Sequence, residues 1–373
     1  MGPICLDCLT YIKSFTNLSS QHHGDHPLHR PAAAVPCSCG VDVHAHVIPG
    51  EFPAYLGGVT PAGWPSMAPA DACHRHVMID GKNYRTVSDK CWTTSRRLAD
   101  FKEMGLQLQA ISPMPELLSY WLSPADGAQL IRFLNEQIAS MVHESDGQLV
   151  GLGAVPLQDL TLAIRELHYL KESLGLKGVE VGSNINGVVI GDPRFDPFFE
   201  ACVALDMPVF VHALRPTGMD RLVGPAPLQQ VLAYPSDVGL AAASVLTGNL
   251  LERYPQLRIA FSHGGGTLAM LLPRLEQAIS VFPALRERVH RSPTAQARAL
   301  FYDTLVFDTP TLRHLVQTFG ASQLMIGTDY PFNFHDKRPV ERIQAAGFEA
   351  PIVAQLLHAN AHRFLGIHSS ALE

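Results

Sequence analysis

The sequence predicts an α/β fold, a closed (β/α)8 barrel of the TIM type, with an insertion after the first strand that contains a small β-hairpin. Eight short apolar runs alternate with stretches of helical periodicity from residue 41 onward. This alternation favours a parallel sheet, because neighbouring parallel strands need crossover connections. Eight such units over about 330 residues suit a barrel with insertions. No G-x-G-x-x-G follows any of these runs, which disfavours an open, doubly wound sheet.

The expected strands are the apolar runs themselves, most of which are rich in β-branched or aromatic residues and end in polar, Gly or Pro positions. Helical periodicity between them is clearest at residues 160–174, 196–205 and 311–319. In chain order, we expect strands at residues 41–46, 108–114, 149–156, 178–183, 208–213, 258–265, 305–310 and 324–332.

A long insertion, at about residues 50–95, follows the first expected strand. Within it, the dipeptide Asp80-Gly81 lies between two extended pieces, HVMI and KNYRTV. Asp-Gly is a preferred two-residue turn of a β-hairpin, so the insertion is expected to form a small hairpin. Because the loops after barrel strands surround the mouth of such a barrel, we expect the hairpin to lie over the mouth.

Residues 1–40 differ in composition from residues 41–373. The first segment holds Cys, His and scattered Pro with no helical or strand period, and we expect it to be a poorly ordered leader. A metal knuckle built on its C-x-x-C and C-x-C pairs is the alternative, although their spacing matches no usual zinc module. Residues 41–373 are expected to form one barrel domain.

The overall composition limits the classes of protein that fit. The net charge of −6 argues against a nucleic-acid-binding surface, which is normally basic. No run approaches the roughly 20 apolar residues that cross a bilayer, and the first residues lack the pattern of a secretion signal. Seven cysteines are few for a disulfide scaffold. We therefore expect a cytoplasmic protein that binds neither nucleic acid nor membrane.

Side chains that bind metals occur near the carboxyl ends of four expected strands. His44 and His46, two residues apart, face the same side of the first strand, and His212, His263 and Asp329 lie at the ends of later strands. Each has an ordinary interpretation singly, such as a hydrogen-bonded core residue. Five together are poorly explained by packing, because a buried polar group costs several kcal/mol unless it is partnered. A divalent cation would satisfy them, and its charge would lower the pKa of a bound water toward about 7.

The motifs around these residues resemble those of a known family. VDVHAHVIP, VHALRPTG, FSHGGG and IGTDYPF are similar to the motif set of the amidohydrolase superfamily, in the branch that contains aminocarboxymuconate semialdehyde decarboxylase. The resemblance runs from about residue 41 to residue 366, and so covers nearly everything but the leader. H-x-H alone is a weak signal, whereas H-x-H followed in order by the other three motifs at barrel-strand spacing is a specific one.

The resemblance implies a role for each of these residues. It implies that His263 acts as acid and base beside a metal-bound water, and that Asp329 belongs to the catalytic machinery as well as to the metal site. Arg85 in the hairpin matches an arginine that holds a substrate carboxylate, and Arg274 matches one that enters the neighbouring subunit's site in a homodimer. The implied ligands of one divalent ion, which we expect to be Zn2+, are His44, His46, His212 and Asp329.

One metal ion is favoured over two. Two-metal amidohydrolases usually need a carbamylated lysine or an equivalent bridge from the fourth strand, which here reads GVEVGS and contains no lysine. Glu180 within this strand has two open interpretations. It either hydrogen-bonds a ligand histidine or is a polar residue of the barrel interior with another partner.

The sequence departs from the named decarboxylase after the strand-five histidine. That enzyme has Pro-Trp-Asp-Met where this chain has Ala213-Leu214-Arg215-Pro216, so the shape and the charge of the substrate pocket differ. Arg215 could pair with a second substrate carboxylate, or it could equally face solvent.

These features predict a metal-dependent, non-oxidative decarboxylase of a small unsaturated or aromatic carboxylic acid, with no organic cofactor. One alternative keeps the site and changes the reaction to hydrolysis of a lactone, amide or similar bond. A metal-dependent structural or binding protein is the non-enzymatic alternative, but it would need a closed set of four ligands. The expected set leaves a position for water and a spare histidine.

Overall fold

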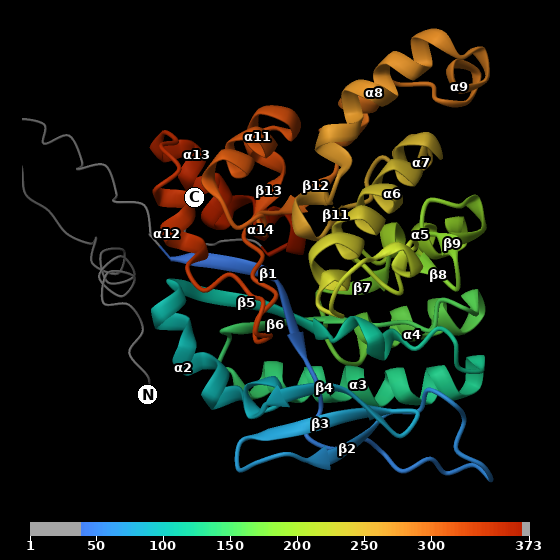
Figure 1. Cartoon of the computed structure of the whole chain (residues 1–373), viewed down its shortest axis with the longest axis vertical. Helices are drawn as coiled ribbons and strands as arrows, with labels where there is room; N and C mark the ends of the chain where they lie inside the picture. Colours follow the sequence, from blue (N-terminus) through green and yellow to red (C-terminus); the bar gives the residue numbers. More distant parts are fainter. Residues whose placement is uncertain (1–38, 368–373) are drawn as a thin grey trace, which may run out of the picture.

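The computed structural model describes residues 39–367, which form a barrel of eight parallel strands (Figure 1). Bridges from Asp42 to Ile326 and from Ala45 to Tyr330 connect the last strand and the loop after it to the first strand, which closes the sheet. The predicted barrel is therefore confirmed. In sheet order the strands are β1 (Gly40–Val47), β5 (Leu106–Pro113), β6 (Leu149–Gly153), β7 (Gly178–Gly182), β10 (Val209–His212), β11 (Ile259–Phe261), β12 (Phe301–Asp303) and β13 (Leu324–Met325).

Helices surround the barrel strands (Figure 1). The Asp159 carboxylate accepts a hydrogen bond from the Leu162 amide, and Asp308 accepts one from the Thr311 amide, so each caps the helix that follows it. The helices are α2 (Thr94–Met104), α3 (Pro124–Glu144), α4 (Leu160–Glu172), α5 (Asp196–Ala204), α6 (Tyr234–Thr247), α7 (Leu250–Arg253), α8 (Leu268–Val281), α9 (Pro283–Arg288), α10 (Pro293–Ala297), α11 (Thr309–Phe319), α12 (Pro339–Gln344), α13 (Ala350–Ala354) and α14 (Asn360–Leu365).

Short helical turns and a two-stranded ribbon complete the connections. The 3-10 turns are η1 (Asp89–Cys91), η2 (Pro115–Leu118), η3 (Pro193–Phe195), η4 (Met219–Arg221), η6 (His263–Gly265) and η7 (Ala321–Gln323), the π turns are η5 (Gln229–Ala233) and η8 (Gln355–Ala359), and the ribbon pairs β8 (Asn184–Ile185) with β9 (Val188–Val189).

The strand predicted at residues 305–310 is wrong, because the seventh barrel strand is β12 and ends at Asp303. Asp308 instead caps α11, and Leu305, Val306 and Phe307 line a cavity. An apolar run looks the same in sequence whether it fills a strand or lines a cavity, which explains the error. The runs at 258–265 and 324–332 also extend well past the ends of β11 and β13.

The insertion forms the predicted hairpin. Strands β3 (His74–Ile79) and β4 (Lys82–Ser88) pair antiparallel, and β2 (Ser66–Pro69) adds a third strand. Asp80 and Gly81 both have positive φ, at 52° and 70°, as a type I′ turn requires.

Strand β1 contains a bulge between Asp42 and Ala45. Val43 packs with Phe210 in the inner apolar cluster, and the His44 ring also lies 5.1 Å from Phe210, so two consecutive side chains face the interior. Asp42 points the other way, where its carboxylate accepts a hydrogen bond from Gln109. A bulge re-aims side chains in this manner next to functional sites.

Two predictions concern regions that the structure tests only in part. The leader expected at residues 1–40 lies outside the described residues except for its last two positions. Among residues 39–367, no helix has both the length and the apolar character needed to cross a membrane.

Candidate metal centre

The four predicted ligands converge at the carboxyl end of the barrel. His44 and His46 lie on β1, His212 ends β10, and Asp329 lies in the loop after β13. One ligand atom from each lies within 4.8 Å of all the others. The two histidine Nε2 atoms of β1 are 3.1 Å apart, and the Asp329 Oδ1 atom lies 3.1 Å from that of His46 and 3.5 Å from that of His44. Ligands about 2.1 Å from a tetrahedral zinc ion would be about 3.4 Å apart, so the spacing fits a single cation.

Hydrogen bonds fix the orientation of all three histidine rings. The Nδ1 atom of His44 lies 2.6 Å from Asp303 Oδ2, that of His46 lies 3.1 Å from the Pro113 carbonyl oxygen, and that of His212 lies 2.9 Å from the Ala213 carbonyl oxygen. Since each Nδ1–H donates to an oxygen, each Nε2 is left with a lone pair for the centre.

The Nε2 atom of His212 is the clearest indication that a cation belongs here. It is buried and has no hydrogen-bond partner among residues 39–367. An unpartnered buried polar atom of this kind costs about 1–3 kcal/mol. A cation at the centre would satisfy it, so the residues present fit a divalent metal ion.

The electrostatics of the site favour positive charge at the same point. Burial lowers the pKa of His44, but hydrogen bonds and charge from Asp303 and Asp329 outweigh burial and raise it to about 10. Burial also opposes the charge on Asp329, yet its two histidine partners on β1 hold its pKa well below the usual value. Burial, followed by the neighbouring imidazoles, holds the pKa of His212 well below its usual value. Two carboxylates that stabilise a proton here would also stabilise a divalent cation.

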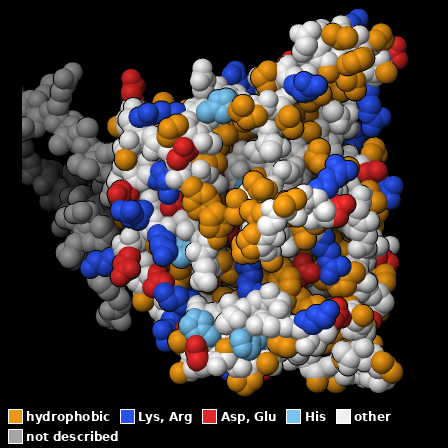
Figure 2. Space-filling model, in the orientation of Figure 1, with side chains coloured by type: hydrophobic (Ala, Val, Ile, Leu, Met, Phe, Trp, Pro, Cys, Tyr) orange, Lys and Arg blue, Asp and Glu red, His pale blue; other side chains and the backbone are white. Residues whose placement is uncertain are grey.

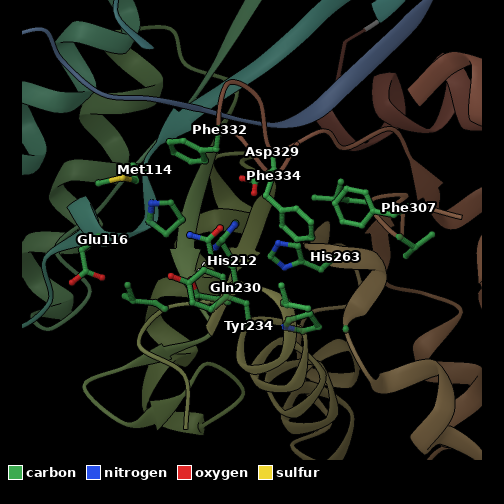
Figure 3. Close-up of a pocket in the computed structure, with 18 of the residues that line it drawn as sticks. Met114, Glu116, His212, Gln230, Tyr234, His263, Phe307, Asp329, Phe332 and Phe334 are labelled. Carbon is green, nitrogen blue, oxygen red and sulfur yellow. Dashed lines mark hydrogen bonds between the residues drawn. The ribbon is translucent and has the colours of Figure 1, made fainter. Parts of the chain in front are cut away.

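His263 lies beside the four ligands but is not one of them. Its ring centroid is 5.4 Å from that of His44 and 5.0 Å from that of His212, and its Nδ1 atom lies 3.1 Å from Ser262 Oγ. Figure 3 shows the ring turned toward the cavity. Burial, with the charge on His44 as the next cause, lowers its pKa to about 4, so His263 is neutral at pH 7 and able to accept a proton.

The sequence analysis missed Asp303, which organises this part of the site. Besides holding the His44 ring, its carboxylate accepts hydrogen bonds from the backbone amides of His263 and Gly264, at 2.9 and 2.7 Å. These two residues have positive φ, at 54° and 65°, so the carboxylate supports an unfavourable backbone turn. Asp303 ends β12, and the sequence FYD could have identified it if the seventh strand had been placed correctly.

Glu180 contacts the site indirectly. Its Oε2 atom accepts a hydrogen bond of 2.6 Å from Ser112 Oγ, and the same hydroxyl lies 3.3 Å from His46 Nδ1. The carboxylate itself is 3.7 Å from that nitrogen, which is too long for a direct hydrogen bond. Burial raises the pKa of Glu180 to about 8. Of the two open interpretations, Glu180 is a neighbour of a ligand histidine, linked to it through Ser112.

A cavity of about 290 Å3 opens onto His212, His263 and Asp329 (Figure 3). Arg85, on β4, lines it, and its guanidinium carbon lies 4.2 Å from the centroid of the Phe332 ring. The insertion therefore does lie over the mouth. Arg274, on α8, is exposed and is not among the lining residues, so within one chain the structure brings only the first of the two predicted arginines to the cavity.

A (β/α)8 barrel with a three-histidine, one-carboxylate centre at the carboxyl ends of its strands defines the class of metal-dependent barrel enzymes. Within this class, the chain belongs to the amidohydrolase family, whose sequence pattern matches residues 41–367. The sequence is 32% identical over 332 residues to the 2-amino-3-carboxymuconate-6-semialdehyde decarboxylase of Dictyostelium discoideum, which covers 88% of this chain and 92% of that protein.

Two solved structures are similar in fold. The IDCase of Metarhizium anisopliae in apo form superimposes with a TM-score of 0.75 at 21% identity, over 89% of this chain and 98% of that one. A dihydroxybenzoic acid decarboxylase from Polaromonas, solved with bound manganese and the inhibitor 2-nitroresorcinol, gives a TM-score of 0.72 at 19% identity, over 90% and 99%.

Proposed function

We propose that this protein is a metal-dependent, non-oxidative decarboxylase of a small unsaturated or aromatic carboxylic acid. The observation that carries the proposal is a one-cation centre that opens onto a cavity containing an arginine and aromatic walls. The decarboxylase from Dictyostelium that covers most of the chain supports it.

Zn2+ is our choice of ion, because three imidazoles and one carboxylate are donors that zinc accepts in a four-ligand site. The manganese in the Polaromonas structure makes Mn2+ the natural competitor. When bound, the ion would act as a Lewis acid that stabilises negative charge developing on the substrate. Buried free thiols at Cys91 and Cys202 support a reducing, cytoplasmic location.

The residues of the chain divide the remaining work. Arg85 binds a substrate carboxylate through charge-assisted hydrogen bonds. The bond between the substrate carbon and its carboxylate breaks, CO2 leaves, and the electron pair stays on that carbon, which then takes up a proton. His263, neutral at pH 7, moves that proton at its ring nitrogen. No electrons leave the substrate, so the reaction requires no oxidant.

A substrate panel tests the proposal. The protein is supplied with aromatic and muconate-like acids, and CO2 release is recorded with and without a chelator. We expect CO2 release together with net proton uptake, and loss of both when the metal is removed. Acidification of the medium without CO2, on a panel extended to lactones and amides, would replace decarboxylation by hydrolysis.

Replacing Arg85 by alanine is expected to raise KM at least about tenfold while kcat changes by less than about threefold, because the lost contact binds the substrate carboxylate. Steady-state kinetics on the best acid of the panel measure both constants. Lys82→Ala, an exposed change on the same strand, is the matched control. An unchanged KM would remove Arg85 from the substrate site.

We also propose a homodimer in which Arg274 enters the partner's cavity. Helix α8 projects from the barrel (Figure 1), and Figure 2 shows apolar side chains along this projection. Met270 and Phe282 expose 73% and 57% of their surface there. Exposed apolar surface of this kind marks a protein interface, and a second copy of the chain would cover it by a two-fold contact.

Mixing two inactive variants tests the shared site. In a dimer of one Arg274→Ala and one His263→Ala subunit, one of the two cavities receives both an intact histidine and an intact arginine. Random exchange is therefore expected to restore about a quarter of wild-type CO2 release. Each variant alone is the control, and subunit exchange is verified with a tagged copy. No recovery after complete exchange would show that the site is not shared.

A further inference from the structure

Arg215, whose partner the sequence left open, forms an ion pair with Glu116. Its Nε and Nη2 atoms donate hydrogen bonds of 3.2 and 2.9 Å to the same carboxylate oxygen, Oε1. The guanidinium carbon also lies 3.2 Å from the centroid of the Trp121 ring. The backbone of Arg215 has a φ of 43°, so these contacts hold its side chain from a strained position. Arg215 is therefore committed to a protein partner.

The carboxylate of this pair belongs to the cavity, while the guanidinium lies outside it. Glu116 lines the cavity and Arg215 does not. Their side chains are 11% and 50% exposed, respectively, so the arginine covers the carboxylate from the solvent side. Figure 3 shows Glu116 next to Met114, on the side of the cavity opposite His263. Among residues 39–367, Oε2 of Glu116 accepts no hydrogen bond, and this oxygen remains free as an acceptor.

The charges along the cavity wall are few and are separated. Arg85 is the one lysine or arginine among the described lining residues, and Glu116 is the one lining carboxylate besides the metal ligand Asp329. A substrate carboxylate held by Arg85 thus has a cationic partner. A second carboxylate at the Glu116 wall would meet a like charge, which is unfavourable in a partly desolvated site.

We infer that Glu116 determines specificity by accepting a hydrogen bond from a hydroxyl or amino group at the substrate end that meets it, and by excluding a carboxylate there. The substrate class is then an unsaturated or aromatic acid whose far end carries such a donor. This inference rests on the proposed function and narrows its substrate. The departure of residues 213–216 from the related decarboxylase falls at this same wall, since Arg215 holds Glu116 in place.

Matched ligand pairs test the inference. The metal-loaded protein is titrated by calorimetry with meta- and para-hydroxybenzoate and the corresponding aminobenzoates, and with isophthalate and terephthalate as dicarboxylates of the same geometry. CO2 release is measured in parallel. Wild type is expected to bind the hydroxy or amino acids at least about tenfold more tightly than the dicarboxylates. Glu116→Gln, which removes the charge and keeps the shape, is expected to narrow this preference to within about threefold.

Two further variants complete the test. Glu103→Gln, an exposed change on α2, should keep the wild-type preference. Arg215→Met leaves the Glu116 charge unpaired and should widen the preference, which provides a second test if Glu116→Gln folds poorly. Equal binding of both ligand classes by wild type, or an unchanged preference in Glu116→Gln, would overturn the inference.

The two readouts separate this inference from the proposed function. CO2 release without any preference for the hydroxy or amino acids would overturn the inference and leave the decarboxylase intact. A binding preference that Glu116→Gln removes would support the inference even if none of the acids released CO2.

Discussion

Replacing His44 by alanine is expected to lower the metal content of the purified protein from about one ion per chain to below about 0.1, and CO2 release to the level of the chelated enzyme. The substitution removes one of four ligands and also the ring that connects the centre to Asp303 through the 2.6 Å hydrogen bond. Three ligands without this support bind a divalent ion much more weakly, because ligand orientation contributes to affinity. Elemental analysis after dialysis measures the change.

His143→Ala is the matched control, because His143 is exposed on α3 and should leave both metal content and turnover unchanged. Circular dichroism checks that the fold of the His44 variant persists. An unchanged metal content in a folded His44→Ala protein would refute the ligand assignment, and the enzymatic proposal with it.

Replacing His263 by asparagine is expected to reduce kcat by about 10²–10⁴-fold while the metal content stays near wild type, because His263 moves a proton and is not one of the four ligands. Asparagine tolerates the positive φ of 54° at this position better than most residues. The backbone amide that donates to Asp303 is kept in the variant. Stopped-time CO2 assays with parallel metal analysis separate the two effects.

His168→Asn, an exposed substitution on α4, is the control for this experiment. Turnover within about threefold of wild type in His263→Asn would place proton transfer on another group. Loss of the metal would make His263 a ligand. Loss of turnover with the metal retained would exclude a purely structural metal site.

The fold could be predicted well because its signals are local. Alternating apolar runs and helical stretches identified seven of the eight barrel strands, and Asp80-Gly81 identified the hairpin of the insertion. The strand at residues 305–310 was misplaced because apolar residues that line a cavity have the same local pattern as apolar residues in a strand. That error also hid Asp303.

The candidate site could be predicted as a set of residues but not as a geometry. His44, His46, His212 and Asp329 were identifiable because the carboxyl ends of parallel barrel strands meet at one rim, so residues far apart in sequence converge there. Nothing local revealed that the Asp303 carboxylate would hold a ring 259 positions away, or that Arg215 would pair with Glu116, 99 positions away.

The sequence by itself determined the barrel, the ligand types and their order along the chain, because each depends on a local pattern or on the general topology of parallel strands. The tertiary structure alone decided which nitrogen each histidine turns to the centre, that Arg85 reaches the cavity, and that Arg215 is bound to Glu116 and so unavailable to a substrate. These features depend on hydrogen bonds and ion pairs between distant segments. Such partners are chosen only when the folded chain brings the segments together.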